Sequence, residues 1–347
     1  MKLAVFSAKS YDREYFQSIQ RSLYPSYKVQ YHSFSLSNET VSLASDCQAV
    51  CVFVNDVLDS TVLSALQQYG VGAVLLRCAG FDNVDLPKAE ELGIFVARVP
   101  AYSPESVAEF AVALIQALNR KTHRAYTRVR EGNFSLDGFI GFTLHGKTVG
   151  IVGIGKIGMA LAKILRGFGC RLLAYDPYPN AEFEKFYGNL VSFDELLAQS
   201  HIVSLHCPLS NATKYIINES SLARIKPGAL LINTSRGGLV DTKAAINALK
   251  SKRLGGLALD VYEAESYLFY NDHSSEIIQD DDLMRLLTLP NALIYGHQAF
   301  LTEEALTQIA EVTFRNLDDY ANQRKCENSL VQGRDILVSG DTQPVRI

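Results

Sequence analysis

Residues 147–176, KTVGIVGIGKIGMALAKILRGFGCRLLAYD, decide the fold of this chain. An apolar β-type run leads into glycines at 153, 155 and 158 and then into a helical pattern. Of these glycines, the first permits a tight turn, the second lets backbone N–H groups reach a pyrophosphate, and the third lets the helix pack on its strand. A second β-rich run ends at Asp176, where a carboxylate would accept ribose hydroxyls and repel a 2′-phosphate. The stretch predicts a dinucleotide site that prefers NAD to NADP; the alternative is an ordinary tight turn.

Length and composition limit the other possibilities. A chain of 347 residues suggests two domains, and a net charge of −4 provides no basic face for nucleic acid. No apolar run is long enough to span a membrane, and residues 1–7 predict a first strand and not a signal peptide. The six cysteines include no C-x-x-C pair. We expect reduced, mostly buried thiols in a cytoplasmic protein with no metal site.

The first hundred residues alternate between β-type and helical patterns, which predicts a parallel sheet with helices on both faces. Cys78-Ala79-Gly80-Phe81 follows the fourth predicted strand, at the edge where such sheets bind ligands. The N–H groups of Ala79 and Gly80 could hold a small carboxylate there, or the segment could be only a tight turn. The predicted strands are 3–7, 28–34, 49–54, 73–77 and 94–99.

Three later segments have distinct patterns. A long helix is predicted from Pro104 to about residue 131, ended by Gly132. Its front half, 107–115, is apolar nearly all round, which favours either a subunit interface or burial within its own domain. Residues 267–286 are acidic and predict a surface insertion before a short helix, and residues 302–324 predict a last amphipathic helix.

Later strands end in polar residues, and in a doubly wound sheet these ends converge on one crevice. The guanidinium of Arg236 suits a carboxylate beside a carbonyl. His297 also stands at a strand end, and histidine is the side chain most often used to deliver a proton to a carbonyl oxygen. Either Glu263 or Glu265 could orient the imidazole. Each residue alone could be a solvated loop residue, but together they predict a hydride-transfer site.

Four motifs carry a resemblance to a known family: VGIGKIG at 152–158, LLINTSRG at 230–237, LDVYEAE at 259–265 and GHQAF at 296–300. The four motifs occur in the same order as in the D-isomer-specific 2-hydroxyacid dehydrogenase family, which the chain resembles over essentially its whole length. It is most similar to the fermentative D-lactate dehydrogenase branch, of which an insertion at 267–282 is typical.

The resemblance implies an α/β fold with two doubly wound parallel-sheet domains and the active site in the cleft between them. One is a flavodoxin-like substrate domain, 1–101 and 298–334; the other is a Rossmann NAD domain, 102–297, and 335–347 form a C-terminal tail. The implied reaction is the reversible NADH-dependent reduction of pyruvate to D-lactate. A homodimer through the NAD domain, or a tetramer, is also implied.

The resemblance further assigns roles to individual residues. Arg236 binds the substrate carboxylate and carbonyl, His297 is the acid/base, and Glu265 is its partner. The implied cofactor-binding residues are Gly153, Gly155, Lys156, Ile157, Gly158, Asp176, His206, Cys207, Pro208, Thr213, Thr234, Ser235, Arg236 and Asp260. The implied substrate-binding residues are Ala79, Gly80, Tyr102, Arg236, His297 and Phe300.

Two other functions are kept open. One is a D-2-hydroxyacid dehydrogenase for a larger, branched or aromatic 2-oxo acid. The other is a non-catalytic NAD-sensing scaffold that resembles the C-terminal binding protein corepressors of the same fold.

Overall fold

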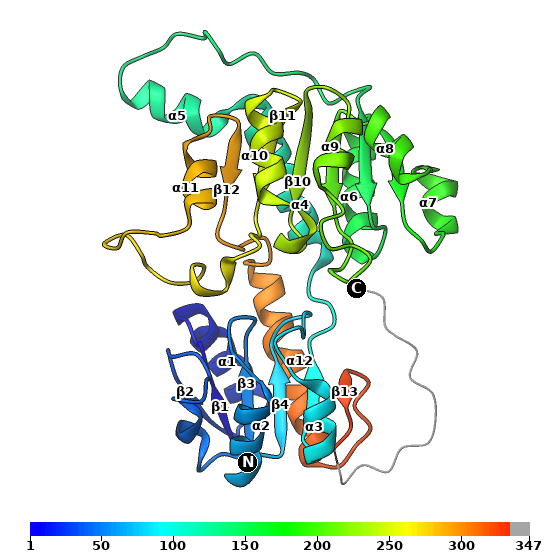
Figure 1. The fold of residues 1–347 in the computed structure, drawn as a ribbon. Coiled ribbons are helices and arrows are strands. Elements are labelled where there is room, and N and C mark those ends of the chain that lie inside the picture. The colour runs from blue at the N-terminus through cyan, green and yellow to red at the C-terminus, as the bar shows by residue number, and fades with distance from the viewer. Residues whose placement is uncertain (334–347) are drawn as a thin grey trace. The chain divides into compact units, whose positions relative to one another are not determined.

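The structure is a computed structural model that describes residues 1–333 (Figure 1). The chain divides into two compact units, one made of Met1–Ser103 and the chain from Phe300, the other of Pro104–Ala299. The tail predicted at 335–347 lies outside the described residues. Each unit contains one sheet with helices, as the alternating sequence pattern predicts.

The first unit contains, among the described residues, a six-stranded sheet in the order β13-β5-β4-β3-β1-β2. Its order from β2 to β5 is that of the flavodoxin-like doubly wound fold. Helix α1 packs against α12, and α2 packs against α3. The elements are β1 Lys2–Val5, α1 Ser10–Leu23, β2 Lys28–Tyr31, η1 Val41–Ala44, β3 Ala49–Val52, α2 Ser60–Gln68, β4 Ala73–Leu76, α3 Leu86–Leu92, β5 Phe95–Arg98, α12 Glu303–Ala321 and β13 Ser329–Val331.

The second unit contains a parallel sheet that has seven strands within the described residues, in the order β12-β11-β10-β9-β6-β7-β8. This is the doubly wound order of dinucleotide-binding domains, with its switch point between β6 and β9. The elements are α4 Pro104–Arg120, α5 Thr122–Arg130, β6 Thr148–Val152, α6 Lys156–Gly167, β7 Arg171–Tyr175, α7 Ala181–Phe186, β8 Gly188–Leu190, α8 Phe193–Gln199, β9 Ile202–Leu205, α9 Glu219–Arg224, β10 Ala229–Asn233, η2 Gly237–Leu239, α10 Thr242–Lys250, β11 Leu254–Leu259, η3 Glu265–Tyr267, α11 Asp281–Thr288 and β12 Ala292–Ile294.

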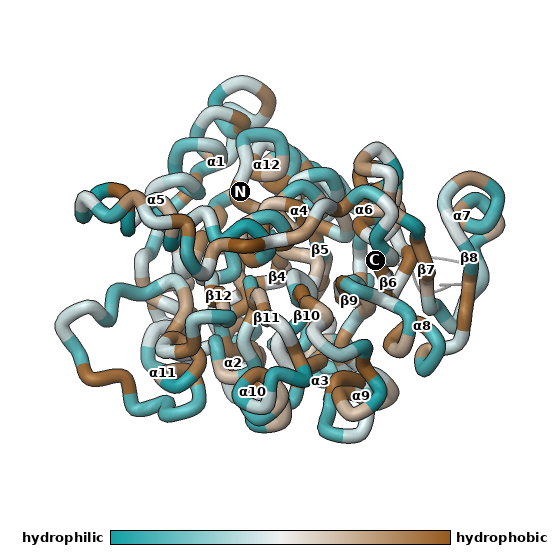
Figure 2. The backbone as a smooth tube through the Cα atoms, turned by 90° about the horizontal axis from the view of Figure 1, so that it is seen from above, coloured by the Kyte–Doolittle hydropathy of each residue, from teal (hydrophilic) through white to brown (hydrophobic). Residues whose placement is uncertain are grey.

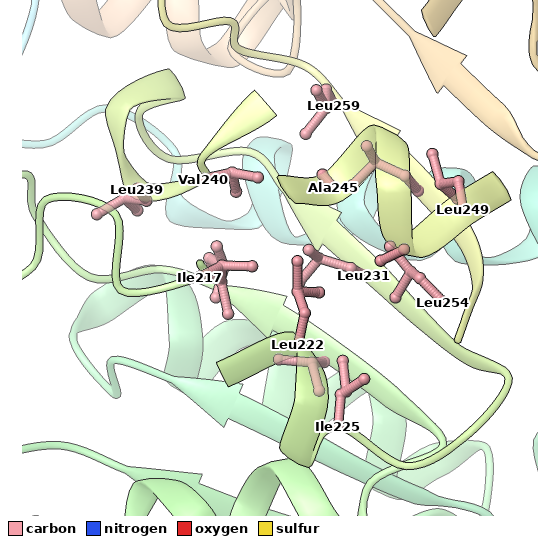
Figure 3. Packing of buried hydrophobic residues seen from close by; sticks show 14 of the residues in the cluster. Ile217, Leu222, Ile225, Leu231, Leu239, Val240, Ala245, Leu249, Leu254 and Leu259 are labelled. Carbon is pink, nitrogen blue, oxygen red and sulfur yellow. The ribbon is translucent and has the colours of Figure 1, made fainter. Parts of the chain in front are cut away.

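Side chains of the second sheet alternate between two hydrophobic clusters, because successive residues of a strand point to opposite faces. In β10, Leu231 belongs to one cluster, whereas Leu230 and Ile232 belong to the other. Figure 3 shows the first cluster, in which Leu231 lies among side chains of α9, α10 and β11. Burial on both faces is what the nearly continuous apolar strands of a parallel sheet require.

The prediction of one long helix to about residue 131 is wrong at Lys121. There the backbone enters the left-handed region (φ 51°), and α4 ends and α5 begins. The break is stabilised by a later segment: Lys121 Nζ donates to the carbonyls of Gly138 and Ile140, and the Asn119 amide exchanges two hydrogen bonds with the backbone of Phe142.

The front half of α4 packs within its own unit. Buried Ala108, Ala111, Leu114 and Ile115 belong to the second hydrophobic cluster, which also includes residues of α6. This observation supports burial within the domain, while a subunit interface stays a prediction.

Residues 268–280 connect η3 to α11 without a helix or strand, as the acidic insertion predicted from the sequence should. Figure 2 shows this connection as a mostly hydrophilic loop. Its beginning is nevertheless anchored, because Leu268 and Phe269 are buried in the first hydrophobic cluster.

No helix among residues 1–333 has the length and apolar character needed to cross a lipid bilayer.

Candidate active site

The glycine turn after β6 is closely packed in the way the sequence predicts. Gly153 has φ 92°, and a Cβ there would lie 2.7 Å from the backbone nitrogen of Cys207. A Cβ at Gly158 would lie 2.1 Å from the carbonyl oxygen of Gly153. The first glycine therefore lets the turn pass beside the end of β9, and the third lets α6 begin against its own strand.

The first turn of α6 has backbone donors to offer. Gly155 is the N-cap, and within the described residues the N–H groups of Lys156 and Ile157 have no hydrogen-bond partner. Free N–H groups and the positive end of the helix dipole favour a phosphate at this position.

Asp176 lies beside the glycine turn, at the end of β7. One carboxylate oxygen accepts the N–H of Ile154 (2.9 Å), and the other accepts that of Tyr178 (2.9 Å). A carboxylate oxygen has further lone pairs, so these two bonds orient Asp176 and leave it able to accept hydroxyl groups.

Two turns, after β9 and β10, join the glycine turn at the same edge of the sheet. Ser235 Oγ donates to the carbonyl of Cys207 (2.7 Å). Pro208 follows Cys207, and its carbonyl accepts the hydroxyl of Thr213 (2.6 Å), which closes the loop after β9. Burial raises the pKa of the Cys207 thiol to about 11, so this cysteine remains protonated at neutral pH.

Two buried polar atoms at this edge have no partner among the described residues: Nδ1 of His206 and Oγ1 of Thr234. The other ring nitrogen of His206 bonds to Ser204 Oγ (2.8 Å), and burial lowers the pKa of this histidine to about 4. Buried polar groups are usually hydrogen-bonded, so orphaned atoms beside a glycine turn and a free helix N-terminus fit a bound dinucleotide.

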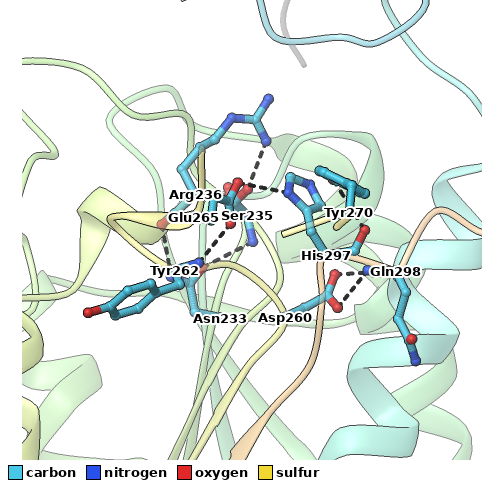
Figure 4. A network of polar contacts seen from close by, with 10 residues as sticks. Asn233, Ser235, Arg236, Asp260, Tyr262, Glu265, Tyr270, His297 and Gln298 are labelled. Carbon is cyan, nitrogen blue, oxygen red and sulfur yellow. Dashed lines mark hydrogen bonds and ion pairs between the residues drawn. The ribbon is translucent and has the colours of Figure 1, made fainter. Parts of the chain in front are cut away.

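His297 and Glu265 form a hydrogen-bonded pair. His297 Nδ1 lies 2.9 Å from Glu265 Oε1, and the two side chains are 16% and 19% exposed. Glu265 Oε2 accepts the N–H of Tyr262 (2.8 Å), which fixes the carboxylate. Glu263 accepts the hydroxyl of Tyr215 instead. Because Nδ1 faces Glu265, Nε2 is the nitrogen that would exchange a proton with a ligand (Figure 4).

Asp260 holds the backbone that carries His297. Its carboxylate accepts the N–H groups of Gln298 and Ala299, each at 2.9 Å, and its carbonyl accepts the N–H of His297 (2.7 Å). Burial raises the pKa of Asp260 above its ordinary range, opposed by His297 and by those two N–H groups. Its side chain is fully buried, so a contact with nicotinamide stays a prediction.

Arg236 lies at the same edge. Within the described residues its guanidinium makes one hydrogen bond, from Nη1 to the carbonyl of Ser235 (2.7 Å), which leaves donors for a ligand. A Cβ at Gly237 would lie 2.0 Å from the carbonyl carbon of Tyr262, so this turn packs directly on the segment that leads to Glu265. Figure 4 shows Arg236, Glu265 and His297 gathered beyond the ends of the strands.

In the first unit, the loop after β4 presents backbone donors. Arg98 Nη1 donates to the carbonyl of Ala79 (2.8 Å). The N–H groups of Ala79 and Gly80 have no partner among the described residues, which suits the small carboxylate proposed from the sequence. In the same unit, the ring of Phe300 packs against two other aromatic rings. Its centroid lies 5.9 Å from that of Phe53 and 6.2 Å from that of Tyr102.

Two residues that orient the site were not singled out from the sequence: Asn233 and Tyr262. The Asn233 amide donates to the carbonyl of Arg236 (2.8 Å) and accepts the N–H of Ser235 (3.0 Å). An asparagine at the end of an apolar run was the available signal in the sequence, and the structure shows that its side chain is fully buried. Tyr262 donates its N–H to Glu265 (2.8 Å) and its hydroxyl to Asp280 (2.9 Å), 18 positions later.

Comparisons with known proteins find chains of similar sequence and fold. Residues 112–299 match the model of the family described as "D-isomer specific 2-hydroxyacid dehydrogenase, NAD binding domain". The chain is 65% identical to 2-hydroxyacid dehydrogenase A of Aspergillus oryzae, with 100% of both chains covered. It is 61% identical to a D-lactate dehydrogenase of Curvularia clavata, with 96% of each covered.

Among solved structures, the chain is similar to the apo-structure of D-lactate dehydrogenase from Escherichia coli. The TM-score is 0.87 at 46% identity, with 95% of this chain and 100% of that chain covered.

Proposed function

This chain belongs to the D-isomer specific 2-hydroxyacid dehydrogenase family and is an NAD-dependent enzyme, and we propose that it reduces pyruvate reversibly to D-lactate. The hydrogen-bonded pair of Glu265 and His297 beside Arg236, on the sheet edge that carries the dinucleotide turn, is the observation that supports this reaction most. NADH, when bound, supplies the hydride.

In the proposed reaction each residue of the site has one task. The guanidinium fork of Arg236 binds the substrate carboxylate and stabilises the negative charge that develops on the carbonyl oxygen. His297 delivers a proton to that oxygen from Nε2, while Glu265 stabilises the protonated ring. In lactate oxidation the neutral imidazole takes the proton back. Ala79, Gly80, Tyr102 and Phe300 are proposed to contact the substrate.

The choice of pyruvate draws on relatives named D-lactate dehydrogenase and on the bulky rings of Phe53, Tyr102 and Phe300. NADH oxidation at 340 nm with a series of 2-oxo acids tests it. We expect the highest kcat/KM with pyruvate, a lower value with 2-oxobutyrate, and much lower values with 2-oxoisocaproate and phenylpyruvate. A preference for either of the last two would make this a dehydrogenase for larger 2-oxo acids. Absence of turnover with every acid would leave only the NAD-sensing scaffold.

The proton-transfer assignment has a separate test. Glu265→Gln keeps a hydrogen-bonding side chain but removes the charge that favours the protonated imidazole. Reduction needs that form, so the alkaline limb of its kcat/KM profile should move to lower pH. Glu263→Gln is the matched control, because Glu263 bonds to Tyr215 and not to His297. A profile that moves only with Glu263 would reverse the assignment.

We also propose a homodimer formed through the NAD-binding unit. Helix α5 has no buried residue among those described, and the loop after it exposes Phe134 (73%), Leu136 (82%) and Ile140 (90%). A short helix without a buried face and an adjacent apolar surface both favour burial against a second copy. Light scattering after size exclusion should give twice the chain mass, and Leu136→Asp with Ile140→Asp should shift the mass toward the monomer. A wild-type monomer would contradict this proposal.

A further inference from the structure

Tyr270 lies in the acidic connection between η3 and α11, where no role has been assigned, and it contacts His297. Its hydroxyl donates to the carbonyl oxygen of His297 at 3.4 Å. Its ring lies against the imidazole, with centroids 5.9 Å apart and planes inclined by 38°. Figure 4 shows Tyr270 directly beside His297. One side chain therefore touches both the backbone and the ring of the proposed proton donor.

Both residues have unusual backbone conformations. His297 has φ 55° and Tyr270 has φ 68°, a region that residues with large side chains rarely adopt. Such conformations persist when surrounding contacts over-determine them, and they concentrate at functional sites. The contact thus joins two strained residues, one of which carries the proposed chemistry.

The contacts around His297 explain how its conformation is held. The N–H of His297 donates to the carbonyl of Asp260, and on the carboxyl side the Asp260 carboxylate accepts the N–H groups of Gln298 and Ala299. Tyr270 holds the carbonyl of His297 itself. On the ring, Glu265 fixes Nδ1. The ring of Tyr270 also packs against the imidazole.

The position of Tyr270 is itself fixed from both ends of its segment. The carbonyl of Glu265 accepts the N–H groups of Leu268 (3.0 Å) and Phe269 (2.9 Å), whose side chains are buried in the hydrophobic cluster. At the far end of the segment, Asp280 accepts the hydroxyl of Tyr262 (2.9 Å), and Tyr262 in turn donates its N–H to Glu265. The connection is thereby tied to the same carboxylate that orients the imidazole.

We infer that Tyr270 is a positioning residue, which holds the imidazole of His297 in the orientation needed for proton transfer. This inference rests on the proposed function of His297 but concerns a residue outside the four family motifs. Because effective proton transfer depends on the geometry of donor and acceptor, loosening the ring should lower kcat more than it weakens substrate binding.

Three variants separate the contributions of ring and hydroxyl. Tyr270→Leu removes both and should lower kcat by roughly tenfold or more, with KM for pyruvate changed by less than about threefold. Tyr270→Phe keeps the ring and should restore most of the lost kcat. Tyr215→Phe is a matched control: Tyr215 also has a left-handed backbone (φ 50°), but its hydroxyl donates to Glu263, so its kcat should not change.

An NMR measurement tests the contact without depending on turnover. The imidazole C–H signals of His297, identified by their loss in His297→Gln, should carry a ring-current shift from Tyr270. Tyr270→Phe should keep that shift and Tyr270→Leu should remove it, while Tyr215→Phe leaves it unchanged. If the wild-type protein shows these shifts but does not turn over pyruvate, the proposed function is rejected while the contact between Tyr270 and His297 stands.

Two outcomes would overturn the inference. One is a Tyr270→Leu enzyme with kcat within about twofold of wild type. The other is a loss of kcat that Tyr270→Phe does not restore, accompanied by an equal rise in KM and a lower melting temperature in both variants. The second outcome would make Tyr270 a general structural residue.

Discussion

Arg77 and Arg236 occupy equivalent places in the two units and are held in opposite ways. Each follows a buried strand of a parallel sheet, β4 or β10, at the edge where such sheets bind ligands. Arg77 is 2% exposed and pairs with Asp12 (3.2 Å), and it also donates to the carbonyl of Ser7 (2.9 Å). The guanidinium of Arg236 bonds only to the carbonyl of its own neighbour, Ser235, among the described residues.

The difference teaches how to separate a structural arginine from one that is available to a ligand. Burying a charge is costly unless it is paired, and Arg77 has that pair within its own unit. It also lies over the ring of Phe53 (4.8 Å), which packs on Phe300. Arg236 keeps unused donors at the edge of its sheet. Arg77 and Arg236 thus have the same position relative to their sheets. They differ in whether a buried carboxylate pairs with the guanidinium.

The largest effect is expected for the buried pair. Arg77→Met leaves Asp12 buried without its partner and should lower the free energy of unfolding of the first unit by about 3–5 kcal/mol. Urea unfolding of the apo protein measures this effect. Adding Asp12→Leu should recover part of the loss, because Asp12 is then no longer an uncompensated charge, whereas the buried carboxyl of Asp56 still lacks the favourable charge of Arg77.

Arg224→Met, at an exposed pair with Asp194, is the control and should change stability little. If Arg77→Met unfolded no more easily than this control, the structural side of the comparison would fail.

Arg236→Lys tests whether Arg236 is the arginine that binds the substrate. An ammonium group cannot make the two parallel hydrogen bonds that a guanidinium makes with a carboxylate beside a carbonyl. We expect kcat/KM to fall by about 10² or more, with urea stability and NADH affinity nearly unchanged. Turnover close to wild type, or a loss of stability like that of Arg77→Met, would show that both arginines are structural.

The contrast between the two arginines also marks what sequence can reveal. Alternating patterns predicted both sheets, and the glycine spacing predicted a turn whose Gly153 and Gly158 are as closely packed as expected. Arg236 was singled out because it stands in a motif. Arg77 was not, because its partner is 65 positions away and no local pattern joins them.

Other features could not be predicted from the sequence because they also depend on contacts between distant positions. The helix break at Lys121 is stabilised by carbonyls 17 and 19 positions later, and the contact of Tyr270 with His297 spans 27 positions. Strand β13, which pairs antiparallel with β5, is only three residues long and too short for a periodic pattern. Local chemistry is readable from sequence, whereas contacts made by tertiary packing require the fold.

His206 provides a test with pH as the variable. Its pKa is lowered to about 4 by burial, whereas the unfolded chain takes up this proton near pH 6.5. Between these values the unfolded state binds more protons, so stability falls as pH falls through this window. His206→Gln should remove up to roughly 2 kcal/mol of the loss between pH 7 and pH 5.

Urea unfolding of the apo protein at the two pH values gives the result. Equal pH dependence in wild type and His206→Gln would mean that Nδ1 of His206 is hydrated, and the case for an unfilled ligand position at this edge would weaken.

The smallest effect concerns coenzyme choice at Asp176. Its carboxylate is held beside the glycine turn by the N–H groups of Ile154 and Tyr178, where it can accept the two ribose hydroxyls of NADH and repel the phosphate of NADPH. Asp176→Ala should weaken NADH binding by several-fold, roughly 1 kcal/mol, and narrow the preference over NADPH. Asp176→Asn keeps an oxygen acceptor for the turn but removes the charge, so it should lose discrimination while losing less NADH affinity. Asp194→Ala, which removes an exposed acid on α8 of the same unit, serves as the control. The measurement is the ratio of kcat/KM for NADH to that for NADPH. If both Asp176 variants keep the wild-type ratio, as the Asp194→Ala control should, coenzyme choice is set by other residues. Asp176 would then be a structural residue of the glycine turn, as Asp12 is the structural partner of Arg77.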